Sequence, residues 1–315
     1  MAAHRIGIVG LGKIAQDQHL PVIAANPAFE LAAVSSTRGL GAGEVPSFRT
    51  AGEMLAAVPD LDAVAICTPP QVRYELAREA LLAGKHVLLE KPPAATISEL
   101  AHLQTLAERT GRVLFTTWHS QYNAAVEECA RRLADQTVTR LFVDWKEDVR
   151  KWHPGQKWIW EAGGFGVFDP GINALSIVTR ILPQPAFLRR ADLFFPANRD
   201  APIAATLTFD GPDLRAEFDW RQDGGEVWEI AVGTASGQSL KLAAGGVRLE
   251  VDGEVVVEEP SAEYAGIYRR FDELLRRGQS LVDPAPFWLV AEAFMLGRRI
   301  EVEAFHYDAR LAPSR

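Results

Sequence analysis

Short apolar runs alternate with longer amphipathic stretches through the first 118 residues. Glycine, proline or polar residues bound each run, a pattern typical of buried strands. The runs cover residues 5–10, 31–35, 63–67, 86–89 and 113–117, and helical stretches lie at 12–25, 73–83 and 97–109. Strands that alternate with helices of this length form βαβ units. Residues 1–120 are therefore predicted to form an α/β domain with a parallel, Rossmann-type sheet.

The pattern changes after about residue 121. One helical stretch, 124–134, precedes a series of segments in which polar and apolar residues often alternate, as in a sheet with one wet face. These segments are 140–145, 187–195, 204–209, 214–220, 227–233, 239–243, 246–251 and 254–258. Residues 121–305 are predicted to form an α+β domain on an open, mostly antiparallel sheet. A closing helix, 286–299, is expected to pack back on the first domain, and 306–315 to form a loose tail.

Length, charge and cysteine content narrow the class of protein. The 315 residues are about twice the ~150 of an average domain, which favours two domains. With 33 basic and 41 acidic residues the net charge is −8, which disfavours nucleic acid and anionic membranes as partners. No stretch approaches the roughly 20 apolar residues of a membrane span, and the N-terminus has no leader pattern. Two cysteines without metal-ligand spacing predict neither disulfides nor a metal site, so a cytoplasmic protein is expected.

A glycine-rich loop follows the first predicted strand. Gly10-Leu-Gly12-Lys13-Ile14-Ala15 is a GxGxxA sequence between a strand and a helix. The first glycine allows a tight turn, the second lets the backbone approach a pyrophosphate, and the small Ala15 permits close helix–strand packing. This context predicts a dinucleotide site that includes Lys13 and Ile14; the alternative is a glycine turn without a ligand.

The residues after the second strand indicate which dinucleotide binds. An NAD site usually has Asp or Glu here, hydrogen-bonded to the ribose 2′-hydroxyl. This chain has Ser36, Thr37 and Arg38 instead, two hydroxyls and a guanidinium that suit a 2′-phosphate. We therefore expect NADP to be preferred and NAD to be a secondary cofactor, unless Arg38 is only a solvated loop charge.

A lysine stands at the end of a later predicted strand. Lys91 follows the run 86–89, in Glu90-Lys-Pro-Pro. A lysine at the carboxyl end of a parallel strand projects into the crevice where such sheets bind ligands. Beside a nicotinamide it can polarise a hydroxyl or carry its proton, although a Glu-Lys at a strand end can also be a surface pair.

Several motifs together resemble the glucose–fructose oxidoreductase/inositol dehydrogenase (Gfo/Idh/MocA) family. They are GLGKIA near the start, CTPP at 67–70, AGKHVLLEKPP at 83–93 and GGFGVFDPGIN at 163–173. The resemblance implies a Rossmann domain that binds a nicotinamide cofactor, with Cys67, Thr68, Pro69 and Glu90 among the cofactor-binding residues. It also implies an antiparallel sheet domain that often forms the oligomer interface, hence a possible homodimer. Lys91 would be the active-site lysine, and its bond to Pro92 a candidate cis peptide.

Two departures from the family pattern concern the proton chemistry. Arg73 stands where the family often has a histidine, and the usual Asp-x-x-x-His pair is Asp169 and Asn173. Asn173 cannot titrate, so the acid–base work shifts to Asp169 and Lys91, either of which is the principal base. Asn173 would hold a sugar hydroxyl. This variant and the stretch 145–161 resemble the branch with bacterial L-arabinose and D-galactose 1-dehydrogenases.

The second domain supplies candidate sugar contacts. Flat aromatic faces interleaved with polar groups are typical of carbohydrate pockets. Trp152, His153 and Glu147 fit this pattern, although any single tryptophan here can equally belong to the core. Trp228 is added by the resemblance, and His119 because it follows the last Rossmann strand. His4, His19, His86, His102 and His306 are expected to be structural.

The resemblance implies oxidation of the anomeric carbon of an aldose to a 1,5-lactone. L-Arabinose, D-galactose and D-fucose share ring configuration, so one pocket is expected to accept all three. Glucose, with its C4 hydroxyl inverted, is expected to be rejected, since an unpaired polar group in a site costs more selectivity than a spare carbon. The alternatives are another sugar, inositol or dihydrodiol dehydrogenase of the family, and a non-catalytic NADPH sensor.

Overall fold

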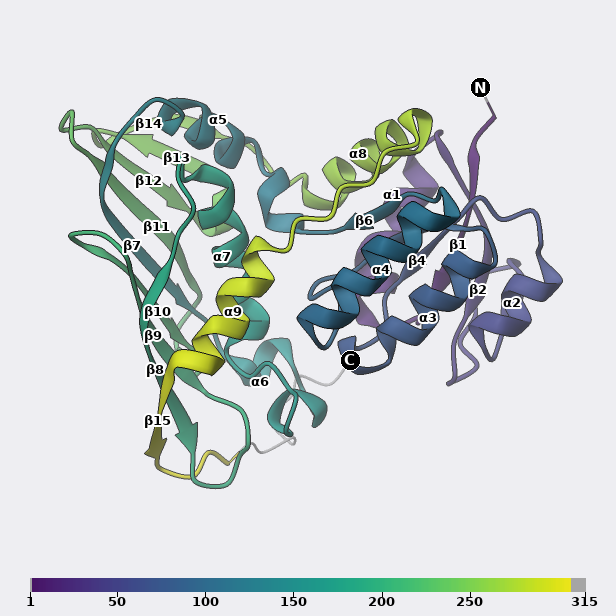
Figure 1. The fold of residues 1–315 in the computed structure, drawn as a ribbon, viewed down its shortest axis with the longest axis horizontal. Coiled ribbons are helices and arrows are strands. Elements are labelled where there is room, and N and C mark those ends of the chain that lie inside the picture. The colour runs from purple at the N-terminus through teal and green to yellow at the C-terminus, as the bar shows by residue number, and fades with distance from the viewer. Residues whose placement is uncertain (1, 307–315) are drawn as a thin grey trace. The chain divides into compact units, whose positions relative to one another are not determined.

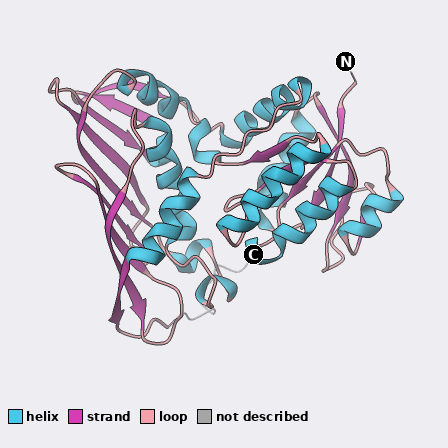
Figure 2. Cartoon of the chain, viewed as in Figure 1, coloured by secondary structure: helices cyan, strands magenta, loops and turns pink. Residues whose placement is uncertain are grey.

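The computed structural model describes residues 2–306 and divides into two compact units. The first consists of Met1–His119 and Ala262–Pro284, and the second of Ser120–Ser261 and Ala285–Arg315. Each unit holds one sheet and its own helices (Figures 1 and 2). The tail predicted over 306–315 lies outside the described residues, except for His306.

The first unit is built on a six-stranded parallel sheet. Its strands are β1 (His4–Val9), β2 (Phe29–Ser35), β3 (Ser47–Phe48), β4 (Ala63–Ile66), β5 (His86–Leu89) and β6 (Leu114–Thr116). They lie in the order β3-β2-β1-β4-β5-β6, which is the Rossmann order. The five apolar runs of the sequence are thus confirmed as strands, and only the two-residue β3 was missed.

Helices cover both faces of this sheet. They are η1 (Ala15–His19), α1 (Leu20–Ala25), α2 (Ala51–Ala57), α3 (Pro70–Leu82), α4 (Ile97–Thr110) and α8 (Glu263–Arg277). Helices α2, α3 and α4 pack in one layer, and α1 packs with α8 in another (Figure 1). The helix expected over 12–25 contains a π-helical turn, η1, just before Pro21, which has no N–H to continue regular α-helical bonding.

A late segment of the chain completes the first unit. Helix α8 packs on α1, and beyond it Leu281 pairs with Phe115 at the edge of β6. The Trp118 indole also donates to the Asp283 carbonyl at 2.9 Å. From the sequence, the helix over 286–299 is expected to pack on this unit. In the structure, α8 is the helix through which the chain returns to the first unit, and the packing expected of 286–299 stays a prediction.

The second unit contains a nine-stranded mixed sheet. Its strands are β7 (Val138–Lys146), β8 (Leu188–Pro196), β9 (Ala204–Phe209), β10 (Leu214–Asp219), β11 (Val227–Thr234), β12 (Ser239–Ala243), β13 (Arg248–Val251), β14 (Glu254–Glu258) and β15 (Gly297–Val302). The order is β14-β13-β12-β11-β7-β10-β9-β8-β15, antiparallel except for the β7–β10 and β8–β15 pairs. The open, mostly antiparallel sheet is therefore confirmed.

Three helices lie along one face of this sheet (Figure 1). They are α5 (Ala124–Leu133), α7 (Phe168–Ile181) and α9 (Ala285–Leu296); the short α6 (Val149–Trp152), η2 (His119–Tyr122), η3 (Trp158–Trp160) and η4 (Ala244–Gly246) lie in loops. Helix α9 belongs to this unit, where it packs on α7 and β8. It ends at Leu296, because the rest of the stretch predicted as helix forms edge strand β15.

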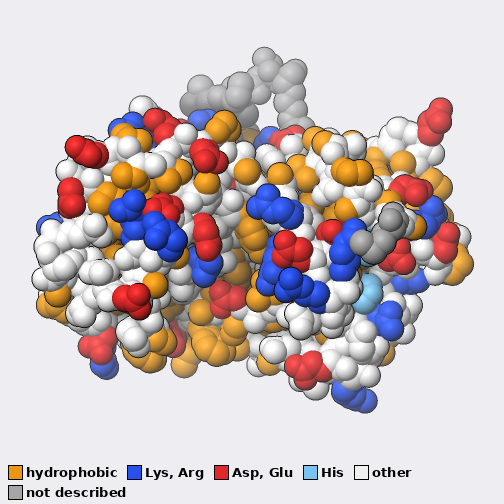
Figure 3. Space-filling view, turned by 90° about the horizontal axis from the view of Figure 1, so that it is seen from above, with side chains coloured by type: hydrophobic (Ala, Val, Ile, Leu, Met, Phe, Trp, Pro, Cys, Tyr) orange, Lys and Arg blue, Asp and Glu red, His pale blue; other side chains and the backbone are white. Residues whose placement is uncertain are grey.

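The opposite face of the second sheet carries charges of both signs. Along β7 the buried Val143 and Trp145 alternate with Asp144 and Lys146, which pair at 2.8 Å. Figure 3 views the chain from above rather than onto this face, and acidic and basic side chains are interspersed over the surface that it shows. Within residues 2–306, no helix combines the length and the apolar character that crossing a bilayer requires.

Candidate functional site

The glycine loop has the geometry that a bound pyrophosphate requires. Gly10 has a φ of +91°, and a Cβ there would lie 2.7 Å from the Thr68 methyl carbon, so no larger residue fits. A Cβ on Gly12 would meet nothing within 4 Å, so the backbone there opens on free space. The helix starts at Lys13, and the buried Ala15 lies against the sheet. Backbone N–H groups are thus available to an anion.

The rim of this loop holds a buried hydroxyl without a partner. Thr68 Oγ1 makes no hydrogen bond in the described part of the chain. A buried unpaired hydroxyl is costly and calls for an explanation, which a bound polar group supplies. Lys13 forms an ion pair with Asp17 one turn along, and Ile14 is partly exposed. The loop therefore fits a dinucleotide phosphate, which Gly10, Gly12 and Thr68 would hold.

The turn after β2 lies against the glycine loop. The Ser36 N–H donates to the Phe48 carbonyl of β3 at 2.9 Å, and Gly39 N–H to Ser36 O at 2.8 Å, which closes the turn. Arg38 donates to the Leu11 carbonyl at 3.2 Å. Arg38 is thus brought to the phosphate loop, 27 residues away in sequence, and the exposed Thr37 lies beside it.

Lys91 follows β5, where a buried polar cluster fixes its backbone. The Lys91–Pro92 bond is cis, as the resemblance implied. The Lys91 N–H donates to Glu90 Oε2 at 3.0 Å, while Glu90 Oε1 accepts from the Tyr264 hydroxyl at 2.8 Å and lies 3.0 Å from His19 Nε2. His19 in turn lies 2.8 Å from the Tyr268 hydroxyl. The Glu90 carboxylate thus points into the cluster and positions Lys91.

Arg73 joins the ends of two strands. Its buried guanidinium donates to the carbonyls of Thr68, Glu90 and Pro92. Thr68 follows β4, and the other two carbonyls follow β5. Where the family often has a histidine, this chain therefore has a cation that ties together two candidate cofactor-binding loops.

Charge stabilises the buried cluster. Burial alone raises the pKa of Glu90, but the bond and charge of His19, with His119 and Arg73, lower it to about 2. Burial alone lowers the pKa of His19, but Cys67, Tyr268 and Glu90 raise it well above its usual value. These opposite shifts favour an ion pair between the Glu90 carboxylate and the His19 ring 3.0 Å away, and burial raises the pKa of Tyr264 and of Tyr268.

His119 lies at the edge of the same cluster. Its Nδ1 is 2.9 Å from Glu263 Oε2, and its ring stacks on Tyr264 with the centroids 5.6 Å apart. Burial alone lowers the pKa of His119; the charge of Glu263 raises it, and that of Lys91 lowers it. The net shift is upward. His119 and Lys91 are thus brought within electrostatic range of each other.

In the second unit, Asp169 forms a close pair with His153. Asp169 lies in the first turn of α7 and is only 6% exposed. Its Oδ2 is 3.2 Å from His153 Nε2, although 16 residues separate them in sequence. Asn173 lies one turn further along α7 and is half-buried. A carboxylate and an imidazole, two groups that enzymes use for proton transfer, are thus in direct contact.

Indole rings gather around Glu147. Both carboxylate oxygens of this buried residue accept indole N–H groups, one from Trp220 and one from Trp228, each at 3.2 Å. The Trp152 ring lies 5.8 Å from that of Trp228, and its N–H donates to Glu226 at 3.2 Å. The structure thus brings Glu147, Trp152 and Trp228 together, with Glu147 holding the rings.

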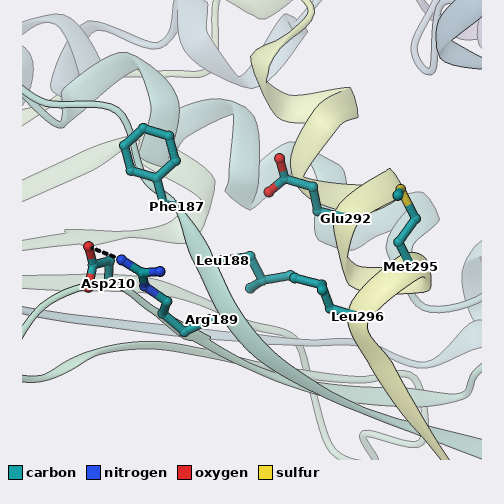
Figure 4. Close-up of a pocket in the computed structure, with 7 residues that line it drawn as sticks. All are labelled: Phe187, Leu188, Arg189, Asp210, Glu292, Met295 and Leu296. Atoms are coloured by element: carbon teal, nitrogen blue, oxygen red, sulfur yellow. Dashed lines mark hydrogen bonds and ion pairs between the residues drawn. The ribbon is translucent and has the colours of Figure 1, made fainter.

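A cavity of about 380 Å³ opens beside His153. Its lining residues come from two loops of the second unit: Val149, His153, Gly155, Gln156, Lys157, Trp160, Glu161, Asn198, Arg199 and Asp200. A larger cavity of about 510 Å³ lies between β8, β9 and the end of α9 (Figure 4). In this larger cavity Arg189 forms an ion pair with Asp210. None of the candidate site residues lines the larger cavity, so of these two cavities the one beside His153 belongs to the candidate site.

Sequence reasoning missed several residues that build these groups. Those made visible only by the fold are His19, Tyr264, Tyr268, Glu263, Trp220, Glu226, Trp160 and Arg199. Some structural features do have a local signal: the TxxE spacing of Thr96 and Glu99 marks the start of α4, where the two residues form a capping box. No comparable local signal marks Tyr264 or Trp220. Across residues 2–306, no three His, Cys, Asp or Glu side chains gather as metal ligands would.

The sheet order and the glycine loop after β1 define the first unit as a nucleotide-binding Rossmann domain. The profile of a family described as "Oxidoreductase family, NAD-binding Rossmann fold" matches residues 4–118. The galactose 1-dehydrogenase of Pseudomonas fluorescens is 48% identical over 307 residues, 96% of this chain and 98% of that protein. The chain belongs to the Gfo/Idh/MocA family of oxidoreductases, as its motifs implied.

Solved structures extend the similarity to the second unit. The D-galactose-1-dehydrogenase of Rhizobium etli has a TM-score of 0.93 and 55% identity, covering 97% of this chain and 99% of that one. A 3-ketoreductase from Actinomadura kijaniata, solved with NADP and TDP-benzene, has a TM-score of 0.81 at 19% identity, with coverage of 95% and 99%. It shares the fold.

Proposed function

We propose that this oxidoreductase is an aldose 1-dehydrogenase. It oxidises C1 of L-arabinose, D-galactose and D-fucose to the 1,5-lactone, with NADP as preferred cofactor and NAD as secondary one. The Asp169–His153 pair beside a cavity and tryptophan rings is the observation that carries the proposal. The full-length similarity to galactose 1-dehydrogenases supports the substrate class.

Asp169 acts as the base on the C1 hydroxyl. The reaction removes a hydride from C1 and a proton from its hydroxyl, and the oxidised nicotinamide, when bound, supplies the hydride acceptor. Asp169 takes the proton, and His153, 3.2 Å away, orients the carboxylate and hydrogen-bonds a second sugar hydroxyl. Asn173, one turn along α7, holds another hydroxyl.

Lys91 positions the C1 hydroxyl or carries its proton. Its ammonium extends from a backbone that Glu90 and Arg73 fix, which suits a group that must be pre-organised. The alternative is that Lys91 is the principal base and Asp169 tunes it. His119 beside Lys91 contributes a further polar contact to the sugar.

Aromatic rings define the sugar-binding wall. Trp152 and Trp228 offer flat faces to the C–H groups of a pyranose. Glu147 fixes Trp228 and the neighbouring Trp220 through their indole N–H groups. The sugar pocket thus depends on Glu147 indirectly.

Residues of the first unit support the preference for NADP. Gly10, Gly12, Lys13 and Ile14 surround the pyrophosphate, and backbone of Cys67, Thr68, Pro69 and Glu90 borders the nicotinamide half. Ser36, Thr37 and Arg38 contact the 2′-phosphate, with no carboxylate among them to repel it.

A panel of sugars tests the activity. NADPH formation is measured with L-arabinose, D-galactose, D-fucose, D-xylose and D-glucose. Turnover confined to the first three is the expected result, and equal kcat/KM for glucose and galactose would contradict it. With NAD in place of NADP, kcat/KM is expected to fall; a preference for NAD of about tenfold or more would overturn the cofactor assignment.

Self-association through the second sheet is part of the proposal. The face opposite α5, α7 and α9 carries Phe142 between charges of both signs, which is compatible with a self-complementary contact. Sedimentation equilibrium of the protein and of Phe142→Glu tests it. Dimers abolished by the substitution are expected, and a wild-type monomer at high concentration excludes the contact.

A further inference from the structure

The side chain of a second arginine, Arg49, packs against the turn that follows β2, although Arg49 itself comes directly after β3. Its guanidinium donates to the Thr37 carbonyl at 3.0 Å. It also covers the bare Cα of Gly39, because a Cβ there would lie 2.8 Å from the guanidinium carbon. Gly39 has a φ of +71°, which favours glycine. Arg49 therefore packs against the turn and is anchored to it.

The backbone of Arg49 is also held in place. Arg49 directly precedes α2, whose capping box joins Thr50 and Glu53. The Glu53 carboxylate accepts the N–H of Arg49 at 3.1 Å and that of Thr50 at 3.2 Å. The side chain therefore starts from a fixed point, which lowers the entropy lost when it binds a ligand.

Two guanidiniums thus flank one turn. Arg38 reaches the glycine loop through the Leu11 carbonyl, and Arg49 holds Thr37 and Gly39. Neither is paired with a carboxylate in residues 2–306, so both positive charges remain available to an anion. A planar guanidinium with several N–H donors matches a phosphate well.

We infer that Arg49 is a specificity-determining residue for the 2′-phosphate of NADP, acting together with Arg38. The inference rests on the cofactor preference proposed above and adds a residue that follows a different strand, β3. Arg49 contributes positive charge to the phosphate and keeps the Ser36–Gly39 turn in the conformation that presents Ser36 and Thr37.

The binding of two small nucleotides tests Arg49 without turnover. Adenosine 2′,5′-bisphosphate and AMP differ only in the 2′-phosphate, and calorimetry gives the Kd of each for the full-length protein. We expect the wild type to bind the bisphosphate at least about tenfold more tightly than AMP, and Arg49→Met to reduce that ratio about tenfold. Arg49→Lys should retain part of this ratio, since an ammonium keeps the positive charge but lacks the planar array of N–H donors of a guanidinium.

A second variant separates the packing of Arg49 from its charge. Gly39→Ala places a methyl group where the guanidinium lies, so the bisphosphate is expected to lose affinity although Arg49 is still present. Arg78→Met, which removes an exposed arginine elsewhere in the same unit, is the matched control and should leave the ratio unchanged. Melting curves of all variants show whether they fold.

The outcomes distinguish the inference from the proposal on which it rests. If the wild type binds both nucleotides equally, the NADP preference fails, and the role of Arg49 with it. If the wild type discriminates but Arg49→Met discriminates equally well, Arg49 has no such role and the preference stands on Arg38.

Discussion

The candidate groups of the two units are held in place by different interactions. Around Lys91, the fixing elements are buried charges and hydroxyls: Glu90, His19, Tyr264 and Arg73. Asp169 contacts His153, whose ring lies 5.1 Å from that of Trp220, the rings of Trp152 and Trp228 are 5.8 Å apart, and mostly polar side chains from two loops line the cavity beside His153. Buried charges tolerate few geometries, whereas packed rings fix a shape through many weak contacts.

The difference matches what each group is proposed to bind. A nicotinamide cofactor is the same in every turnover, so a rigid charged cluster beside it suits a fixed geometry. Sugars differ in single hydroxyls, so a site that recognises them changes its specificity when a single polar contact changes. Disruption of the first group should therefore reduce stability, and disruption of the second should mainly change kinetics.

The largest expected effect is on turnover, at Asp169. Asp169→Asn keeps the shape but cannot take a proton at neutral pH, so kcat should fall by about 10²–10⁴-fold. NADPH binding, measured by fluorescence titration, should persist because this substitution lies in the other unit. The exposed Asp210→Asn is the matched control. A kcat within about twofold of wild type would remove Asp169 from the proton transfer.

Next in size is a loss of stability at Glu90. Glu90→Gln leaves the buried, positively charged His19 without its anion, and we expect the free energy of unfolding to fall by about 3 kcal/mol. Urea denaturation measures it. Glu30→Gln, which removes one partner of an exposed pair with Arg5, should change it by about 0.5 kcal/mol or less. Equal effects of the two substitutions would show that the cluster is not stabilised by charge.

The stability lost in Glu90→Gln is expected to depend on pH. The Glu90 pKa is lowered from 4.5 to about 2, so its contribution is present above pH 4.5 and is lost as the pH falls toward 2. The His19 pKa is raised, so its contribution is present below pH 6.5 and is lost as the pH rises through the higher folded value. The difference in Tm between wild type and Glu90→Gln should therefore be greatest between pH 4.5 and 6.5. His86, whose pKa is lowered to about 4, titrates in both proteins and cancels.

A smaller effect is expected from the residue that holds the rings. Glu147→Gln retains one acceptor oxygen and so loses one of its two indole bonds. We expect KM for D-galactose to rise about tenfold with a smaller change in kcat, because one of the two tryptophan rings becomes less firmly held while no reacting group is lost. Glu217→Gln, on the opposite face of the sheet, should leave both constants unchanged. A fall in kcat alone would place Glu147 in the chemistry instead.

The smallest predicted change comes from the C-terminal end of the described chain. Phe305 pairs with Asn198 through its backbone N–H, at 2.9 Å, and its carbonyl, at 3.0 Å, and its ring lies 5.5 Å from that of Trp160. Asn198 and Trp160 line the cavity beside His153, so Phe305→Ala should raise KM for the sugar a few-fold, about 1 kcal/mol or less. Phe187→Ala, at the other cavity, should not change it.

Local sequence signals predicted the first sheet well. Buried parallel strands are short apolar runs, and GxGxxA marks the first of them, so the strands from β1 to β6 were found except β3. Helix α8 was not predicted at all, although Tyr264, Ile267 and Phe271 have helical spacing. Its destination depends on contacts with residues near position 90, which no local pattern encodes.

The sequence indicated single residues of the candidate site but not which of them are in contact. Asp169, His153, Glu147 and Trp228 were named from the sequence, while the 3.2 Å contact of Asp169 with His153 depends on how a loop folds back on α7. Glu147 illustrates the limit most clearly. Its residue type suggests a sugar ligand, yet both its oxygens accept indole N–H groups, since burial brings those rings to it.

The return of α8 to the first unit has a consequence for synthesis on the ribosome. Glu90 and His19 are made early, but Tyr264 and Tyr268 follow only after strands β7 to β14 of the second unit. Nascent domains usually fold in order from the N-terminus. Here the first unit can complete its core only after strands β7 to β14 of the second unit have been translated, and the second unit in turn waits for α9 and β15. The two units are therefore completed in an interleaved order, and the unit that begins folding first must wait for a late segment of the chain.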